Sequence, residues 1–351
     1  MAGAGRPGVW TGARRLRQCH RPPRQRERAG DGAAVPGGCR GEIGSTLPNP
    51  DIGEARALGL GIDAGGTRTR WALAAREGAV LAEGEVAGLS ALQMCSAEGR
   101  RGAAETFAAL AAAVLAHGRP ARVRAGLTGF GGDGEALAPM LAALFDIGAP
   151  AVALCDDIEI AYLAHFEPGQ GYLVYAGTGS IGAWIDPDGR LHRAGGRGVT
   201  LDDGGGGFWI AREAMRHIWR GEDECPGRWR DSPMAHAVFA QVGGSDWRFS
   251  RQFVYGQQRG AVGRLALAVA ATADSDPAAA AILHGAGVEL ARLARALEAR
   301  YGARPVVLSG RAAELHPRVF AAMRAALPAA TALTRSSSVA HVAAARLAAK
   351  A

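Results

Sequence analysis

Two glycine-rich turns, each followed by hydroxyl side chains, are the parts of this chain best suited to phosphate chemistry. The first spans 63–69, where Asp63 is followed by two glycines and then by two threonines at alternate positions. The second spans 177–180, where glycines again alternate with hydroxyl side chains. Backbone N–H groups in such turns form anion-binding concavities, and a carboxylate beside them can hold a hydrated Mg²⁺. One such hairpin alone is more often structural, but the pair favours binding of a nucleoside triphosphate.

Two acidic pairs supply carboxylates for phosphoryl transfer. Asp156-Asp157 follows an apolar segment and begins a predicted helix. Asp157 therefore has two equally supported interpretations, a helix N-cap or a general base that accepts a proton from a substrate hydroxyl. Asp203 precedes four glycines, 204–207, which let the backbone approach a ligand while the carboxylate accepts bonds from sugar hydroxyls. Gly310 follows a late apolar segment, where an adenine could lie on the backbone.

The segments that must position these residues repeat in the same order. Each half of the chain beyond residue 57 begins with three strand-like segments separated by turn residues, which predicts an antiparallel meander. Helical and strand patterns then alternate, which is typical of α/β layer domains. The sequence therefore predicts two like domains facing a cleft, 55–160 (completed by a C-terminal helix at 338–351) and 161–337. The predicted strands are 58–63, 67–74, 79–87, 123–127, 151–155, 172–176, 180–186, 190–193 and 305–308, and the predicted helices are 97–117, 133–145, 157–166, 208–219, 247–272, 276–301, 317–326 and 339–349.

The positive charge is concentrated at the N-terminus. Of the formal net charge of +7, residues 1–50 carry nine arginines against three acidic residues, which leaves about +1 for the rest. A basic nucleic-acid-binding surface on the body is therefore not indicated. Residues 1–54 are rich in glycine and proline and show no apolar periodicity, so we expect a disordered basic tail. An Arg-rich transit peptide and a start codon assigned too far upstream stay open as alternatives.

Lysine usage excludes several enzyme classes. The chain has one lysine, Lys350, beside 39 arginines. P-loop enzymes, protein kinases and Schiff-base enzymes each need an internal lysine, so none of these sites can be built here. The five cysteines show neither CxxC nor zinc spacing, which is typical of free thiols in a reducing cytosol. The longest apolar runs fall far short of the roughly 20 residues of a membrane span, so we expect a cytoplasmic protein without membrane contact.

A dinucleotide-binding motif is the main competing interpretation of the first turn. Residues 59–64 satisfy the pattern GxGxxA, and Glu83 and Glu85 lie about twenty residues further on. That motif requires a helix directly after the glycines, whereas residues 67–74 have the pattern of a strand. The sequence therefore favours a phosphate turn over a dinucleotide site.

The motifs together resemble the actin-like ATPase superfamily of sugar kinases and chaperone ATPases. They are most similar to its N-acetylglucosamine kinase branch, the BadF/BadG/BcrA/BcrD ATPase family. Residues 88–91 and Gly196-Arg197 resemble the bacterial glucosamine kinases in particular. Five motifs follow the family order and are closed by a small-residue helix after Val339: 63–69, Asp157, 177–180, 195–207 and 309–310.

This resemblance implies two RNase H-like, actin-like domains with an interdomain cleft, and an ATP- and Mg²⁺-dependent kinase for glucosamine or N-acetylglucosamine. Asp157 would be the catalytic base, Asp63 would lie at the metal, and a homodimer is left open. The implied ATP-binding residues are Asp63, Gly65, Gly66, Thr67, Thr69, Gly177, Thr178, Gly179 and Gly310. The implied substrate-binding residues are Ser90, Asp157, Ser180, Gly196, Gly198 and Asp203.

Several positions depart from the family pattern. The acidic turn usually reads Asp-Glu/Gln-Gly-Ser-Gly, whereas Gly204 and Gly206 stand at its second and fourth positions here. Leu92 and Arg197 stand where eukaryotic sugar pockets have an Asn and a Trp, which leaves the identity of the sugar open. The zinc cluster of the repressor–kinase family and the cluster cysteines of the acyl-CoA reductase activators are absent. The alternatives are an ATPase that drives a conformational change in a partner protein, without a phosphosugar product, and a non-catalytic sensor of nucleotide or sugar.

Overall fold

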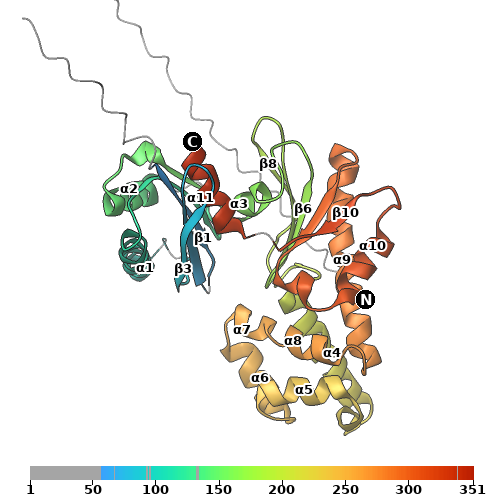
Figure 1. Cartoon of the computed structure of the whole chain (residues 1–351). Helices are drawn as coiled ribbons and strands as arrows, with labels where there is room; N and C mark the ends of the chain where they lie inside the picture. The colour runs from blue at the N-terminus through green and yellow to red at the C-terminus, as the bar shows by residue number, and fades with distance from the viewer. Residues whose placement is uncertain (1–56, 67, 92–93, 95, 132–133, 338) are drawn as a thin grey trace, which may run out of the picture. The chain divides into compact units, whose positions relative to one another are not determined.

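Two five-stranded mixed sheets form the framework of the protein (Figure 1). The computed structural model describes residues 57–351 except 67, 92–93, 95, 132–133 and 338. The predictions for the tail 1–54, for Thr67 and for Leu92 lie outside the described residues. The predicted α/β class is confirmed, and each sheet begins with the predicted antiparallel meander.

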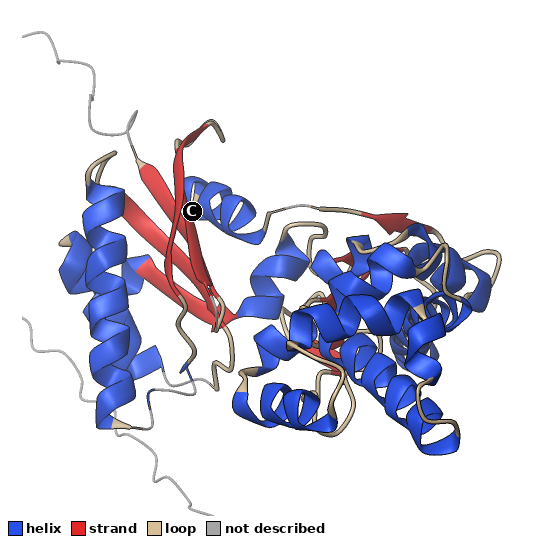
Figure 2. Cartoon of the chain, turned by 90° about the horizontal axis from the view of Figure 1, so that it is seen from below, coloured by secondary structure: helices blue, strands red, loops and turns tan. Residues whose placement is uncertain are grey.

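The first sheet carries helices on both faces (Figure 2). Leu60 and Ile62 pack against α1 (Ala97–Leu115) and α2 (Gly134–Phe145), while α11 (Ala340–Lys350) covers the opposite face. In spatial order the strands are β3 (Val80–Ala87), β2 (Arg68–Ala74), β1 (Leu58–Ala64), β4 (Pro120–Leu127) and β5 (Val152–Asp156). Because β1, β4 and β5 run parallel, their carboxyl ends meet at one edge of the sheet.

The glycines at 59 and 61 serve the packing of α11 on β1. A Cβ atom on Gly59 would overlap the backbone of Ala349, and one on Gly61 would overlap the carbonyl oxygen of His341. The segment after β1 is the antiparallel strand β2 and not a helix. These glycines allow α11 to pack closely on the face of the sheet, whereas a dinucleotide site needs glycines that let a pyrophosphate approach the end of a strand. The dinucleotide-binding interpretation of residues 59–64 is therefore excluded.

The larger of the hydrophobic cores packs on the second sheet. In spatial order its strands are β10 (Leu333–Arg335), β9 (Val306–Ser309), β6 (Tyr172–Ala176), β7 (Ser180–Ile185) and β8 (Leu191–Gly195), with β6, β9 and β10 parallel. Its core takes in the long helix α9 (Pro277–Tyr301), α10 (Pro317–Ala326) and α4 (Gly207–Glu224). It also takes in Ile158 and Tyr162 of α3 (Asp157–Leu163). Helix α3 therefore begins at an end of the first sheet but buries its apolar side chains in the core of the second.

Short helices between α4 and α9 differ from the sequence prediction. The predicted helix 247–272 is wrong as one element, because glycines and Gln257-Gln258 divide it into three. A further helix was missed, although Ser232 caps it and Pro233 stands at its first position, which is a recognised start signal. The four helices are α5 (Pro233–Val242), α6 (Trp247–Gly256), α7 (Arg259–Gly263) and α8 (Ala266–Thr272), and single 3₁₀ turns lie at Ala149–Ala151, Arg228–Asp231 and Arg311–Glu314.

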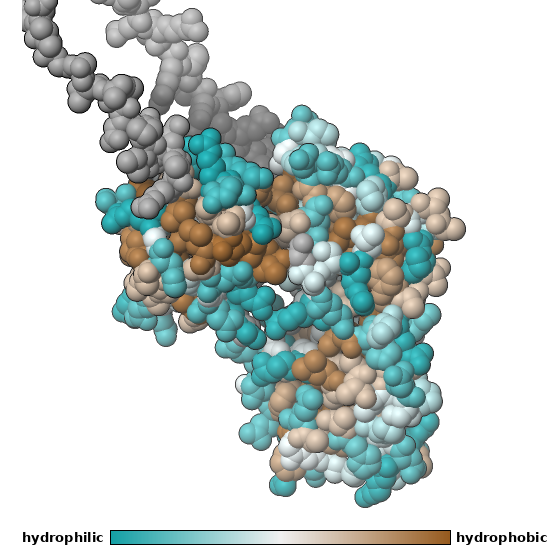
Figure 3. Space-filling model, in the orientation of Figure 1, coloured by the Kyte–Doolittle hydropathy of each residue, from teal (hydrophilic) through white to brown (hydrophobic). Residues whose placement is uncertain are grey.

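Apolar residues in the described part are distributed as in a packed α/β protein. On the face shown in Figure 3, hydrophilic and hydrophobic residues are interspersed. In the ranges that the structure describes, no single helix is long and apolar enough to cross a membrane. Two consecutive helical segments, Arg259–Thr272 and Pro277–Tyr301, have the length and composition of a membrane span only when they are taken together. The chain bends by 117° between them.

Candidate active site

The carboxyl edge of the first sheet brings three polar side chains together. Asp63 lies at the end of β1, Thr128 directly follows β4, and Asp157 directly follows β5. Asp63 is in register with Gly126 of β4, so the parallel strands end at the same level. The sequence predicted Asp63 and Asp157 at this edge. It missed Thr128, although the position of Thr128 directly after a predicted strand was a usable signal.

Asp157 is the first residue of α3 and not its N-cap, so the capping interpretation is wrong. The cap is Asp156, whose Oδ1 accepts a hydrogen bond from the Ile158 N–H at 3.2 Å. Glu159 completes a capping box by accepting from the Asp156 N–H. Gly126 makes room for this helix start, because a Cβ there would lie 3.0 Å from the Asp157 Cα. The Asp157 carboxylate is therefore free of a capping role.

The surroundings of Asp157 suit a general base. Thr128 donates its Oγ1–H to Oδ2 of Asp157 at 2.5 Å. The pKa of Asp157 is raised from 3.8 to about 7, first by burial and then by the Asp156 carboxyl and the charge of Asp63, while the Thr128 hydrogen bond lowers it. A base is most effective when its pKa lies near the working pH. A carboxylate of this kind accepts a proton from a substrate hydroxyl at neutral pH.

Asp63 is the carboxylate best placed for a metal-bound phosphate. It is in cross-strand register with Arg70, and burial raises its pKa while the charge of Arg70 lowers it. No hydrogen bond from the described residues engages its carboxylate, and no group of three or more His, Cys, Asp or Glu residues in the described part forms a closed metal site. Mg²⁺ usually takes one or two protein carboxylates and completes its shell with water and phosphate oxygens. One buried, otherwise unengaged carboxylate fits that requirement.

The turn after β1 has the open backbone that a phosphate needs. Gly65 donates its N–H to the Arg68 carbonyl at 3.0 Å, and its own carbonyl accepts from the Leu89 N–H at 3.0 Å. No described atom lies within 4 Å of a Cβ built on Gly66. Ser90 follows at the same edge and donates its hydroxyl to the Thr128 carbonyl at 3.1 Å. Gly65 and Ser90 are thus joined to the same edge as Thr128, and the binding roles of Gly65, Gly66 and Ser90 stay predictions.

Thr69 does not join this group. It pairs with Ala64, so its side chain shares the sheet face of Ala64 and Ile62 and not that of Asp63. It is fully buried, and its hydroxyl has no hydrogen-bond partner among the described residues. The prediction of direct ATP contact by Thr69 is therefore wrong for this geometry, because side chains alternate between the faces of a strand.

The second turn rests against the start of α4. The N–H groups of Gly207 and Phe208 donate to the carbonyls of Gly177 and Thr178, both at 2.9 Å. A Cβ on Gly206 would lie 2.6 Å from the carbonyl carbon of Gly179. The glycines that precede α4 therefore let its first turn approach the 177–180 backbone. Thr178 stays exposed on this turn.

Asp203 joins three loops beside that turn. Its Oδ1 accepts the Gly198 N–H at 3.0 Å, and the Arg197 N–H also donates to its carboxylate. Burial raises the pKa of Asp203, and these two hydrogen bonds lower it. The residue has φ 54°, a left-handed conformation that is uncommon outside glycine. A Cβ on Gly179 would overlap Oδ2 of Asp203, so only glycine fits there.

Ser180 and two glycines complete the second group. Ser180 is buried and donates its hydroxyl to the Gly204 carbonyl at 2.7 Å, so it holds the acidic turn. Gly196 has φ 64° and lies on the same loop as Gly198. Gly310 has φ 97°, and a Cβ on it would lie 2.5 Å from the Ala176 carbonyl oxygen. The ends of β6 and β9 therefore meet at the second turn, and the binding roles of Gly196, Gly198 and Gly310 stay predictions.

Two further residues link the two groups. Tyr175, directly before the second turn, has its pKa raised by burial and then by the negative charges of Asp63 and Asp157. Arg193 of β8 forms an ion pair with Asp156, with Nη2 and Oδ2 2.7 Å apart. The sequence missed both, because nothing local in their segments marks a tyrosine or arginine that acts across the fold.

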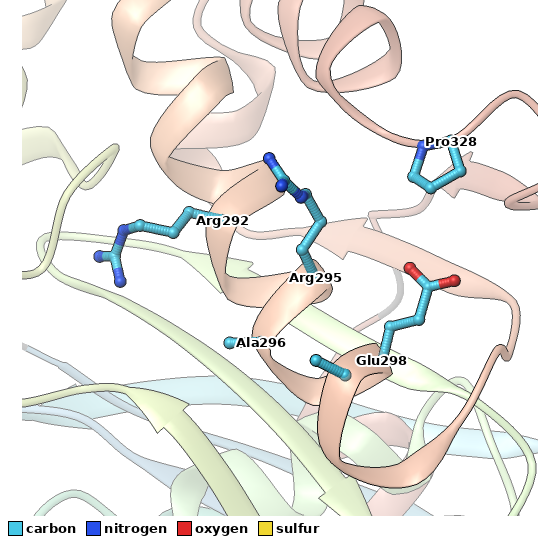
Figure 4. Close-up of a pocket in the computed structure, with 6 residues that line it drawn as sticks. Arg292, Arg295, Ala296, Glu298 and Pro328 are labelled. Carbon is cyan, nitrogen blue, oxygen red and sulfur yellow. The ribbon is translucent and has the colours of Figure 1, made fainter.

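Two hollows of the described surface lie away from these residues. One, of about 540 Å³, is lined by residues of α9 and by Pro328 (Figure 4). Its Arg292 is already paired with Asp202 and Glu289. The other, of about 410 Å³, is lined by Glu314 and residues 335–337. We therefore assign the site from the convergence of carboxylates and glycine turns at strand ends and not from surface shape.

Comparison with known proteins gives the family. A sequence profile of the BadF/BadG/BcrA/BcrD ATPase family matches residues 60–329. The chain belongs to this family. The match includes both turns, Asp157, Asp203 and Gly310, and it confirms the resemblance inferred from the motifs. A search of curated proteins gave no match to this member of the family.

Solved structures show the same fold as this BadF/BadG/BcrA/BcrD ATPase. A protein of Chromobacterium violaceum provisionally named N-acetylglucosamine kinase is 29% identical, with a TM-score of 0.63, covering 84% of this chain and 99% of its own. A protein of Porphyromonas gingivalis with the same provisional name is 16% identical, with a TM-score of 0.63 and coverage of 81% and 96%. A glucokinase of the ROK family from Streptomyces griseus, in complex with glucose and AMPPNP, is 18% identical, with a TM-score of 0.55 and coverage of 83% and 98%. The predicted actin-like two-domain fold is confirmed, and the protein is an ATPase-family member with the fold of sugar kinases.

Proposed function

We propose that this protein transfers the γ-phosphoryl group of MgATP to a hydroxyl of an amino sugar, glucosamine or N-acetylglucosamine. The observation that carries the proposal is Asp157, a partly buried carboxylate beyond the end of β5 whose pKa of about 7 suits a base. The relative of 29% identity, provisionally named N-acetylglucosamine kinase, supports the substrate class. An ATPase without a sugar substrate has no need to deprotonate a sugar hydroxyl.

The base acts through a carboxylate oxygen of Asp157. Thr128 donates to Oδ2 and the Asp156 carboxyl lies beside it, and on binding the substrate hydroxyl would give its proton to this carboxylate. As that proton moves to Asp157, the hydroxyl oxygen forms a bond to the γ-phosphorus and the bond to the bridging β–γ oxygen breaks, which releases ADP. The barrier is lowered mainly by positioning and charge neutralisation. Asp157 then returns its proton to water.

The two turns would hold the polyphosphate. The backbone N–H groups of Gly66, Thr178 and Gly179 would donate to phosphate oxygens, and Thr178 would add a hydroxyl. Gly310 would lie under the adenosine, and Asp203 with Gly198 would face the sugar. Asp63 would hold Mg²⁺, which when bound neutralises charge on the phosphates.

A product assay with a panel of hexoses and hexosamines tests the proposal. ADP release is followed with each sugar, and the product is identified by mass spectrometry. The proposal predicts ADP release that depends on an amino sugar, with a phosphosugar as product. Sugar-independent hydrolysis would instead support an ATPase that acts on a partner protein, and phosphorylation of a neutral hexose alone would replace the substrate class.

A further inference from the structure

Asp156, the residue next to the proposed base, is a buried carboxylate with both oxygens engaged. Only 8% of the residue is exposed. Its Oδ1 caps α3 through the Ile158 N–H, and its Oδ2 pairs with Arg193 at 2.7 Å. Arg193 comes from β8, so the contact is made by an element far from Asp156 in the chain.

The position of Arg193 is itself fixed. The Arg193 carbonyl accepts a hydrogen bond from Nη1 of Arg300 at 2.8 Å, which ties β8 to the end of α9. Arg300 also lies over the ring of Tyr301, with 4.7 Å between the guanidinium carbon and the ring centroid. In addition, Ile158 and Tyr162 of α3 are buried in the hydrophobic core that packs on the second sheet, the sheet that contains β8. Arg193 is therefore held by the second sheet, and Asp156, at the end of β5 of the first sheet, begins a helix whose apolar side chains are buried in the core of the second.

An unpaired Asp156 would disturb Asp157 directly. Two adjacent buried carboxyls without a cation tend to share one proton, since the second ionisation places like charges side by side. A shared proton would occupy the oxygen that must accept the substrate's proton. The Arg193 guanidinium places a positive charge on one oxygen of Asp156, and the other oxygen stays with the helix cap.

We propose that Arg193 is a positioning residue for phosphoryl transfer: it holds Asp156 and the first turn of α3 so that Asp157 presents an unprotonated oxygen to the substrate hydroxyl. This inference rests on the proposed function of Asp157 as the base. Arg193 acts through Asp156 and does not need to touch the sugar or the nucleotide.

Several other charged or titratable groups face the two carboxyls and contribute to any pH dependence. Asp63 lies on the first sheet and Tyr175 on the second. Removing the Arg193 cation removes an interaction that favours the ionised carboxyls. Asp157 should then bind its proton up to a higher pH. The remaining groups around the pair are Cys155, Glu159 and Arg124, with Arg70 and Arg311 beyond Tyr175.

The test compares full-length Arg193→Gln and Arg193→Lys with a matched control, Arg190→Gln. Arg190 is an exposed arginine at the turn of the same hairpin, and its guanidinium has no partner among the described residues. We expect Arg193→Gln to lower kcat about tenfold with both KM values within about twofold, and to move the acid limb of the kcat–pH profile to higher pH. Arg193→Lys should restore part of kcat, and Arg190→Gln should match wild type.

A carboxyl ¹³C titration of aspartate-labelled protein supplies a readout without turnover. Signals are assigned with Asp156→Asn and Asp157→Asn, and the Asp157 titration should move to higher pH in Arg193→Gln. The inference would be overturned if the Asp157 titration and kcat were both unchanged in Arg193→Gln. It would also be overturned if Arg193→Gln lost activity only because its melting temperature fell, and Arg193→Lys did not restore that activity. If wild type forms no phosphosugar, the proposed function fails, and the titration still decides the role of Arg193.

Discussion

Replacing Asp157 by Asn separates catalysis from stability. Asn has the same size and can still accept the Thr128 hydrogen bond, and the helix cap is unaffected because Asp156 provides it. The substitution removes only the carboxylate charge. We expect kcat to fall about 10²–10⁴-fold, the usual contribution of a general base, while MgATP and sugar still bind.

The same substitution, Asp157→Asn, should raise the free energy of unfolding although it lowers kcat. Burial raises the pKa of Asp157 from 3.8 to about 7, so between these pH values the folded state binds a proton that the unfolded chain has released. Stability contributed by this group therefore falls as pH rises from about 4 to about 7. At about 1.4 kcal/mol per pH unit, the ionised carboxylate destabilises the fold by on the order of 2–4 kcal/mol at pH 8. Asp157→Asn should regain that amount at pH 8 and less than half of it at pH 5, because only part of the interval between the two pKa values has been crossed there.

Urea unfolding of both proteins at pH 5 and pH 8 measures this difference, and isothermal calorimetry measures ligand binding. Asp223→Asn, which changes an exposed aspartate on α4, is the matched control and should alter neither activity nor stability. Near-normal turnover of Asp157→Asn would refute its role as base. An equal stability difference at the two pH values would refute the buried charge.

Other substitutions test the turns and the tail. Thr178→Val should weaken ATP binding by about 1–3 kcal/mol if its hydroxyl bonds a phosphate, as measured by calorimetry, and unchanged binding would remove that contact. Gly206→Ala should abolish ATP binding because its Cβ would lie 2.6 Å from the Gly179 carbonyl carbon, whereas Gly102→Ala on α1 meets nothing within 4 Å and should be neutral or stabilising in thermal melts. Deleting residues 1–54 should leave the melting temperature and ATP turnover nearly unchanged, and a large drop in either would show that the segment packs on the body.

Local patterns were sufficient to predict most of the fold. The alternating segments of both meanders and the apolar runs before Asp157 and Gly310 matched observed strands within a residue or two. Strand β10 was missed because three residues at a sheet edge carry too little pattern. The region 247–272 was read as one helix because the glycines that divide it are each tolerated inside helices.

The candidate site was predictable where chemistry and backbone coincide. Glycine with aspartate or hydroxyl residues at a strand end indicated both turns and Asp157. The face of the sheet on which each side chain lies was harder to predict. Thr69 lies on the opposite face from Asp63, and only the β1–β2 register shows this. Arg193 and Thr128 act on Asp156 and Asp157 from distant segments, so long-range packing, and not local sequence, assigns them.

A single-turnover experiment with γ-labelled ATP and excess enzyme tests the central claim most directly. It measures how much label appears in phosphosugar for each ADP formed, with N-acetylglucosamine or glucosamine present. Our account predicts one phosphosugar for each ADP from wild type, with a rate that falls below about pH 7 as Asp157 is protonated. Label recovered as inorganic phosphate with either sugar present would contradict it.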